Sequence, residues 1–137
     1  MILVLGVIVC HDAELKAISG LNGASAIIAL ANSYRSFAKE HKELYVLIMN
    51  TAASCGDKLS GVSDCITQPF MSVLEGYSLS ETEKIHWQRI LRGIVHGFVS
   101  QEYSGFFSHF PADTDETFEI AVNCYICGLQ NAEKRRF

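Results

Sequence analysis

One segment, residues 80–104, restricts the fold of this 137-residue chain more than any other. It opens with Ser80-Glu81-Thr82-Glu83, the pattern of a capping box, in which the Ser80 and Glu83 side chains satisfy each other's backbone N–H groups. We expect a helix that runs from here to Ser104, where Gly105 can adopt the left-handed conformation that ends a helix. At 1.5 Å per residue this helix is about 36 Å long, so the other elements must pack along it.

Helical patterns also occupy most of the remaining chain. After the turn signal Asn22-Gly23, Ala24–Glu40 has apolar residues at helical spacing, and Glu43–Thr51 follows as a short apolar helix. A turn around Pro111 leads to a final helix, capped by Thr114 or an adjacent Asp, that ends near Asn131. No alternating strand pattern competes after Cys10, and the sequence therefore predicts an all-α bundle.

The segment before residue 80 is predicted as a loop followed by a helix. Polar and small residues indicate the loop, namely Gly56, Asp57, Ser60, Gly61 and Ser63. Pro69 lacks the backbone N–H that a helix interior needs, but it is well suited to a first turn. We therefore expect Pro69 to open a helix that contains Phe70, Met71 and Leu74.

Charge and cysteine content exclude several classes of protein. The chain has 11 Lys and Arg against 15 Asp and Glu, a net charge of −4, and its one dense basic run is Lys134-Arg135-Arg136. Binding of nucleic acid through its phosphates is therefore not expected of this chain. Five cysteines are an odd number for a disulfide framework, which predicts reduced thiols and a cytoplasmic protein.

The first ten residues, Met1–Cys10, are almost entirely apolar. They are too few for a bilayer core, which needs about twenty, and no positive charge precedes them as in a secretory signal. We predict no membrane segment. Two interpretations remain, a first helix or strand that is buried or covered by a partner, and an unnatural start to a longer protein.

The two C-terminal helices carry more apolar surface than one core needs. In the long helix one face contains Trp87, Ile90, Leu91, Ile94, Val95 and Phe98, and a separate stripe contains the small residues Gly93, Gly97, Ser100 and Ser104. In the last helix one face contains Phe118, Ala121, Val122, Tyr125 and Leu129, and the opposite face contains Ile120, Cys124 and Cys127. These second faces predict a homodimer with a twofold four-helix interface, although a single compact chain that buries both faces is the alternative.

His96 lies between the small residues of the long helix. We assign it to the predicted dimer interface together with Gly93, Gly97, Ser100, Ser104, Ile120, Cys124 and Cys127. A hydrogen bond or a titratable switch inside the domain is the other interpretation of this histidine.

The order of several motifs resembles the C-terminal domain of TetR-type transcriptional regulators. The resemblance rests on the helix and joint Tyr34–Tyr45, on Trp87, on the run Ile90–Glu102 with its His-Gly pair, on Gly105-Phe106-Phe107, and on Pro111, Asp113, Asp115 and Thr117-Phe118. Together these segments cover roughly residues 24–130. The resemblance implies a helical bundle that binds a small effector and dimerises through its last two long helices.

Family members begin with a three-helix DNA-binding domain, and this chain has no segment of that kind. We therefore divide it into a connecting remnant, residues 1–20, and a ligand-binding and dimerisation domain, residues 21–137, that reaches DNA only through a missing N-terminal domain. A fragment, a truncated gene product and a module that acts through another protein all remain open.

A hydrophobic or aromatic effector is expected inside the bundle, between the short helices and the long one. The predicted ligand-binding residues are Tyr34, Phe37, Tyr45, Met49, Phe70, Met71, Leu74, Trp87 and Leu91. The alternative is that these residues form a plain core, in a structural dimer module that binds a partner protein and no ligand.

Enzymatic and metal-binding motifs are not found in the sequence. It has no Gly-x-Ser-x-Gly elbow, phosphate-binding loop or His-Glu-x-x-His motif. Cys124 and Cys127 supply two thiols on one helical turn, but a structural zinc needs four ligands. We therefore expect no catalytic residue, metal or cofactor.

Overall fold

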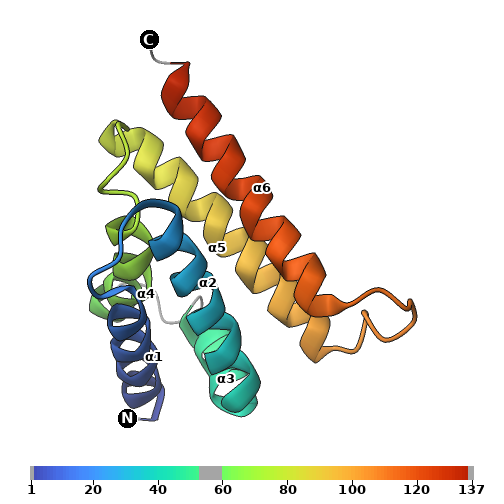
Figure 1. Ribbon diagram of the computed structural model, residues 1–137. Helices are drawn as coiled ribbons and strands as arrows, with labels where there is room; N and C mark the ends of the chain where they lie inside the picture. The colour runs from blue at the N-terminus through green and yellow to red at the C-terminus, as the bar shows by residue number, and fades with distance from the viewer. Residues whose placement is uncertain (1, 53–59, 136–137) are drawn as a thin grey trace.

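In the computed structural model, which describes residues 2–52 and 60–135, the chain forms α-helices and no strand within those ranges (Figure 1). The helices are α1 (Ile2–Ile18), α2 (Gly23–Glu40), α3 (Lys42–Ala52), α4 (Ser60–Ser72), α5 (Glu81–Tyr103) and α6 (Thr114–Lys134). The predicted all-α class is confirmed. Helices α5 and α6 run antiparallel, and the shorter helices lie on one side of this pair.

The predicted start and end of α5 and the predicted start of α6 are confirmed, whereas α6 continues past the predicted Asn131 to Lys134. The Ser80 hydroxyl accepts a hydrogen bond from the Glu83 N–H at 3.2 Å, and the Ser80 N–H donates to the Glu83 carboxylate at 2.7 Å. Gly105 follows α5 with a φ of +78°, which a residue with a Cβ rarely adopts. Asp113 caps α6 by accepting a hydrogen bond from the Asp115 N–H at 3.0 Å.

The prediction for the segment before α5 was wrong. Pro69 lies near the end of α4 rather than at the start of a helix, and α4 includes Ser60, Gly61 and Ser63, which were predicted as loop. Gly56 and Asp57 lie outside the described residues. Pro69 breaks one helical hydrogen bond, but Pro69 and Phe70 are fully buried. The packing of these two side chains against other helices offsets the lost hydrogen bond. Rules based on neighbouring residues in the sequence cannot predict such a contact.

The apolar start of the chain is a helix, not a strand, and it forms the first part of α1, Ile2–Ile18. Gly6 allows α1 to approach α3 closely, because a Cβ at this position would lie 2.5 Å from the Leu44 Cδ1 atom. Among the described residues, no helix has the length and apolar character that crossing a membrane requires.

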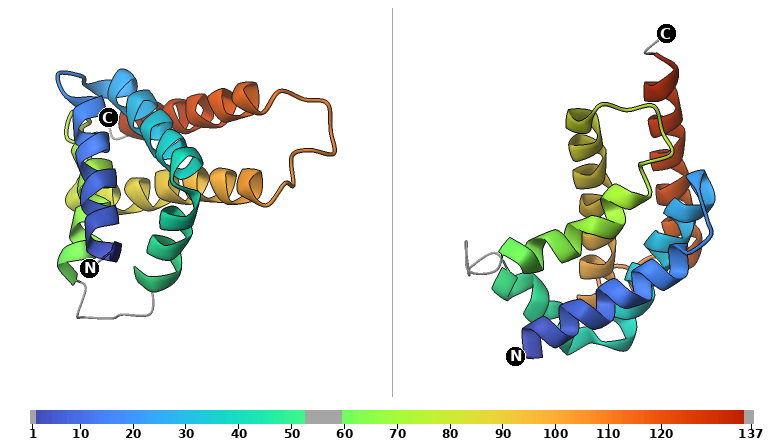
Figure 2. Two further views of the ribbon diagram at one scale, coloured as in Figure 1. Left: turned by 90° about the horizontal axis from the view of Figure 1, so that it is seen from below. Right: turned by 90° about the vertical axis from the view of Figure 1, so that its left-hand side faces the viewer.

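Two apolar clusters hold the helices together. The main cluster joins α2, α4, α5 and α6 and includes the fully buried side chains of Ile27, Leu30, Phe70, Leu74, Leu91 and Leu129. The second cluster joins α1, α2 and α3 through Val7, Phe37 and Ile48, and partly buried residues including Cys65 and Ile66 of α4 pack against it. Figure 2 shows α1 and α4 side by side.

The inner faces of α5 and α6 are buried largely as the sequence predicted. Leu91, Val95 and Phe98 of α5 are buried, and so are Phe118, Val122, Tyr125 and Leu129 of α6. Ile90 is a correction, because its side chain is 46% exposed and lies outside the core. Successive side chains on a helix point about 100° apart, so Ile90 and Leu91 face different directions. The predicted apolar face was therefore too broad.

Candidate functional site

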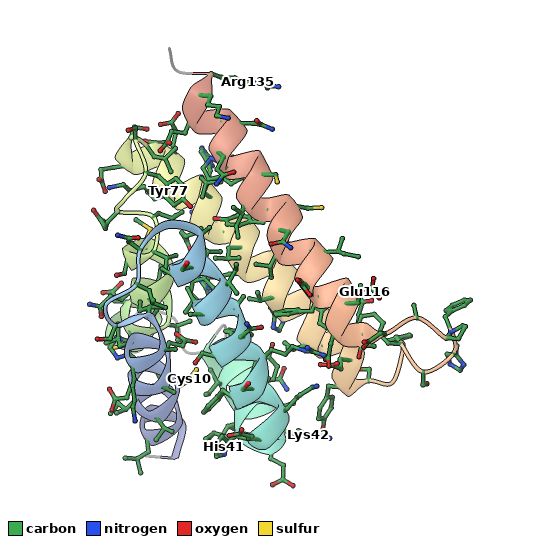
Figure 3. The ribbon with its side chains drawn as sticks, viewed as in Figure 1. Cys10, His41, Lys42, Tyr77, Glu116 and Arg135 are labelled. Atoms are coloured by element: carbon green, nitrogen blue, oxygen red, sulfur yellow. The ribbon has the colours of Figure 1, made fainter. Side chains whose placement is uncertain are left out.

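A small cavity lies at the boundary between the second cluster and the main cluster, where α1, α2, α3 and α4 meet. Its volume is about 20 Å³, and its walls are formed by Val7, Cys10, His11, Glu14, Tyr34, Phe37, Tyr45, Ile48, Met49, Cys65 and Ile66. The four residues of α1 share one helical face because they are spaced three or four apart. Figure 3 shows Cys10 pointing from α1 towards α2 and α3.

Glu14 brings a carboxyl group into this mostly apolar cavity. Its side chain is only 3% exposed, and the Cys10 thiol donates a hydrogen bond to Oε1 over 3.3 Å. Burial raises the pKa of Glu14 to about 7, against a smaller lowering by the Cys10 hydrogen bond and the Arg92 charge. Burial, with the neighbouring Glu14 charge, also raises the pKa of the Cys10 thiol far above its usual value.

A chain of polar side chains leads from the cavity to α5. The Tyr34 hydroxyl donates to the Tyr45 hydroxyl at 3.3 Å, and the Tyr45 hydroxyl is hydrogen-bonded to Nδ1 of His96. Burial, together with the charge of Arg92, lowers the pKa of His96. Burial also raises the pKa of both tyrosines. All three groups are therefore neutral near pH 7, and they connect the cavity wall to the long helix.

The structure brings four of the nine predicted ligand-binding residues to this cavity. They are Tyr34, Phe37, Tyr45 and Met49. The other five, Phe70, Met71, Leu74, Trp87 and Leu91, do not line it. Phe70, Leu74 and Leu91 are fully buried in the main cluster, Met71 is half-buried on α4, and Trp87 packs edge-on against Tyr125 with ring centroids 5.6 Å apart.

The sequence analysis missed the contribution of α1 to this cavity. Cys10, His11 and Glu14 lie in the segment that it treated as a connecting remnant. One signal was available, since Glu14 follows Val7 and Cys10 at helical spacing and thus places an acid on an apolar face.

The outer surface of α5 and α6 is a second candidate site. Ile90 and Ile120 are 46% and 55% exposed, and Cys124 and Cys127 are exposed free thiols. No atom lies within 4 Å of a Cβ built on Gly93 or Gly97. Ser100 and Ser104 are also exposed. His96 differs from the other predicted interface residues because its ring lies against Tyr45 of α3. The described residues of one chain leave this surface uncovered.

An open groove between α2 and α6 is much larger than the cavity, but its cation, Arg35, is already paired. Arg35 forms two hydrogen bonds with the Glu102 carboxylate, at 3.1 and 2.7 Å, and an ion pair of 2.8 Å with Asp115. The guanidinium also lies over the Phe98 and Phe118 rings, 5.2 and 5.0 Å from their centroids. This groove is therefore a stabilised joint between α2, α5 and α6 rather than an obvious ligand site.

Metal-binding geometry is not found in the described part of the chain. No group of three or more His, Cys, Asp or Glu residues in residues 2–52 and 60–135 lies close enough to hold an ion. Cys124 and Cys127 are exposed on α6 and do not line the cavity.

The comparison with protein families identifies the class of this fold. Residues 27–125 match the model described as "Tetracyclin repressor-like, C-terminal domain". The match covers most of the chain, and the chain therefore belongs to the tetracyclin repressor-like (TetR) family. It contains the domain that, in these regulators, binds effectors and forms dimers. A search of curated protein sequences found no match.

Proposed function

We propose that this chain is an effector-sensing and dimerisation domain, and that a small hydrophobic or aromatic molecule binds in the cavity between α1, α2, α3 and α4. The observation that carries this proposal is the combination of apolar walls with three converging polar groups, the Glu14 carboxyl and the Tyr34 and Tyr45 hydroxyls. Ligand sites in proteins combine apolar walls with a few polar groups in this way.

Ligand entry must enlarge the cavity. A volume of about 20 Å³ holds about one water molecule, whereas ligand pockets measure roughly 300–1,000 Å³. The walls belong to α1, α2, α3 and α4, and a shift of these helices relative to one another widens the cavity. A ligand that binds the opened arrangement more tightly shifts the population towards it. The Tyr45–His96 hydrogen bond then passes the change to α5.

The uncovered surface of α5 and α6 supports a homodimer. Gly93 and Gly97 leave open space on α5, and Ile120 adds an exposed apolar side chain on α6. An isologous contact between two such surfaces forms a four-helix interface, in which the glycines let the helices approach closely. His96 belongs to the inner side of α5 in this arrangement, where it links the cavity to the interface helix.

Ligand binding is tested by thermal unfolding with a panel of small aromatic compounds. A compound that binds the native state raises Tm. Ile66→Trp fills the cavity and should abolish that rise, whereas Ile85→Trp, on the exposed side of α5, should preserve it. Stabilisation that survives in Ile66→Trp would place the binding site elsewhere, and no stabilisation by any compound contradicts the proposal.

Dimerisation is tested by sedimentation velocity. The wild-type chain should sediment as a dimer at micromolar concentration, and Gly97→Leu should convert it to a monomer by filling the space between the helices. Ser36→Leu adds the same side chain at an exposed position on α2 and should remain dimeric. A monomeric wild type, or a Gly97→Leu dimer of unchanged affinity, contradicts the proposed interface.

One observation favours a second function, a structural module without a ligand. Leu5, Ile8 and Val9 form an exposed apolar face on α1, with exposed fractions of 55%, 46% and 49%. Such a face can bind another protein. This alternative is favoured if no compound in the panel binds while the dimer persists.

A further inference from the structure

Glu14 differs from the other buried charged residues of the described chain. Arg35 and Lys84 are buried, and both have ionic partners, Glu102 and Asp115 for Arg35, and Glu75 and Glu81 for Lys84. In residues 2–52 and 60–135, Glu14 forms no ion pair, and the Cys10 thiol is its one hydrogen-bonding partner. A buried carboxylate without a cation is costly unless something supplies the positive charge.

The nearby basic side chains do not supply this charge within ion-pair distance. The Arg92 guanidinium is hydrogen-bonded to the Thr67 hydroxyl at 3.5 Å and lies 6.0 Å from the centroid of the Phe70 ring. His11 lines the cavity, but its Nε2 is hydrogen-bonded to Gln68 at 2.8 Å and its Nδ1 lies 3.8 Å from Asp12. Neither group forms an ion pair with Glu14 within the described residues.

The other walls of the cavity are suited to a positive charge. Tyr34, Phe37 and Tyr45 contribute aromatic rings, whose faces attract cations. The main cluster holds a buried cation with the same kinds of groups, since the Arg35 guanidinium contacts the carboxylates of Glu102 and Asp115 and lies over the rings of Phe98 and Phe118. The cavity thus has a carboxyl group and aromatic rings, like the surroundings of Arg35. In the cavity, however, no basic side chain of the described residues pairs with the carboxyl group.

We propose that the effector carries a positive charge, as an amine or ammonium group on an otherwise apolar or aromatic body, and that Glu14 is its counter-ion. This inference rests on the proposed function, because it assumes that the cavity is the effector site. It restricts the ligand class from hydrophobic molecules in general to lipophilic cations.

Two probes that differ in charge alone test the inference. Benzyltrimethylammonium and its neutral carbon isostere, neopentylbenzene, have nearly the same shape, and their affinities are measured by isothermal titration calorimetry. The wild-type protein should bind the cation more tightly than the isostere by about tenfold or more. Glu14→Gln should weaken cation binding by about the same factor and leave the isostere unaffected.

A matched control and a second variant complete the experiment. Glu116→Gln removes one negative charge from an exposed position on α6, away from the cavity (Figure 3), and should change neither affinity. Glu14→Leu removes the carboxyl group in a second way, in case the amide of the Glu14→Gln variant disturbs folding. Circular dichroism establishes that each variant is folded before its affinity is compared.

The inference and the proposed function fail in different ways. Equal affinities for the two probes, or a Glu14→Gln variant that binds the cation as well as the wild type, overturn the charge preference alone, and the cavity remains an apolar effector site. The inferred preference for a positive charge is also refuted if neither probe binds while other compounds of the panel bind. If no compound binds, the effector site itself is refuted.

Discussion

The main cluster and the second cluster contain similar apolar side chains but are packed differently. In the main cluster Phe70, Leu74 and Leu91 are fully buried, and its buried cation, Arg35, is paired on α5 and α6. In the second cluster the side chains surround free space, and its buried charge, Glu14, has no ionic partner. The main cluster is packed without such a space, whereas the second cluster borders the cavity that we propose as a binding site. Differences in unfolding free energy between matched variants test this contrast.

The largest expected loss of stability comes from truncating one aliphatic side chain in each cluster. Leu91→Ala should lower the free energy of unfolding by about 4 kcal/mol, and Ile48→Ala by about 2 kcal/mol. Both residues are buried, but Ile48 already faces the cavity and makes fewer contacts to lose. Urea denaturation measures both values. Equal losses would show that the second cluster is packed as tightly as the main one.

The next largest effect concerns Glu14 and depends on pH. Its pKa is raised from 4.5 to about 7 in the folded protein, so the folded state binds the proton more tightly than the unfolded state. The resulting stabilisation is fully present below pH 4.5 and is lost as the pH rises to about 7. Glu14→Gln should therefore be more stable than the wild type by about 3 kcal/mol above pH 7, with little difference below pH 4.5. Denaturation across this range measures the effect, and a constant difference between the proteins would exclude it.

Arg35 provides the matching test in the main cluster. Arg35→Gln should destabilise the protein by about 2 kcal/mol, because Glu102 and Asp115 lose their charge-assisted hydrogen bonds. Lys39→Gln is the control, since the Lys39 amine lies 3.7 Å from Glu102 and is half-exposed, and it should cost less than about 0.5 kcal/mol. Similar losses of unfolding free energy in both variants would mean that burial of the Arg35 ion pairs does not increase the stability of the protein.

The smallest effect concerns the start of α5. Ser80→Ala removes the capping box and should cost about 1 kcal/mol. Hydrogen exchange should increase in the first turn of α5 and remain unchanged in α1. Faster exchange in α1 as well would indicate that the two clusters unfold together rather than as separate regions.

The elements that the sequence predicts well are those that depend on local interactions. The capping box of α5, the glycine at position 105 and the Asp113 cap of α6 each involve residues that lie close together in the chain. Pro69 was misplaced because its position depends on burial beside Phe70 against other helices. The position of a proline alone does not contain this information.

The candidate site was only partly predictable, for a related physical reason. The aromatic residues of α2 and α3 were found from helical spacing and from the resemblance to the family. The cavity, however, requires α1 and α4 to meet across more than fifty residues of sequence, from Val7 to Ile66. Periodicity identifies a buried face but not whether that face borders a core or an empty space. Glu14 could therefore be proposed as a ligand-binding group only once its position in the cavity was known.

The most direct test of the proposed site uses the methionine methyl groups as reporters. Met49 lines the cavity, whereas Met71 lies on α4 outside its walls. With methyl-labelled methionine, titration with benzyltrimethylammonium should shift the Met49 resonance in the ¹H–¹³C NMR spectrum and leave Met71 in place. A shift of Met71 without Met49, or no shift of either resonance with any stabilising compound, would contradict an effector site between α1, α2, α3 and α4.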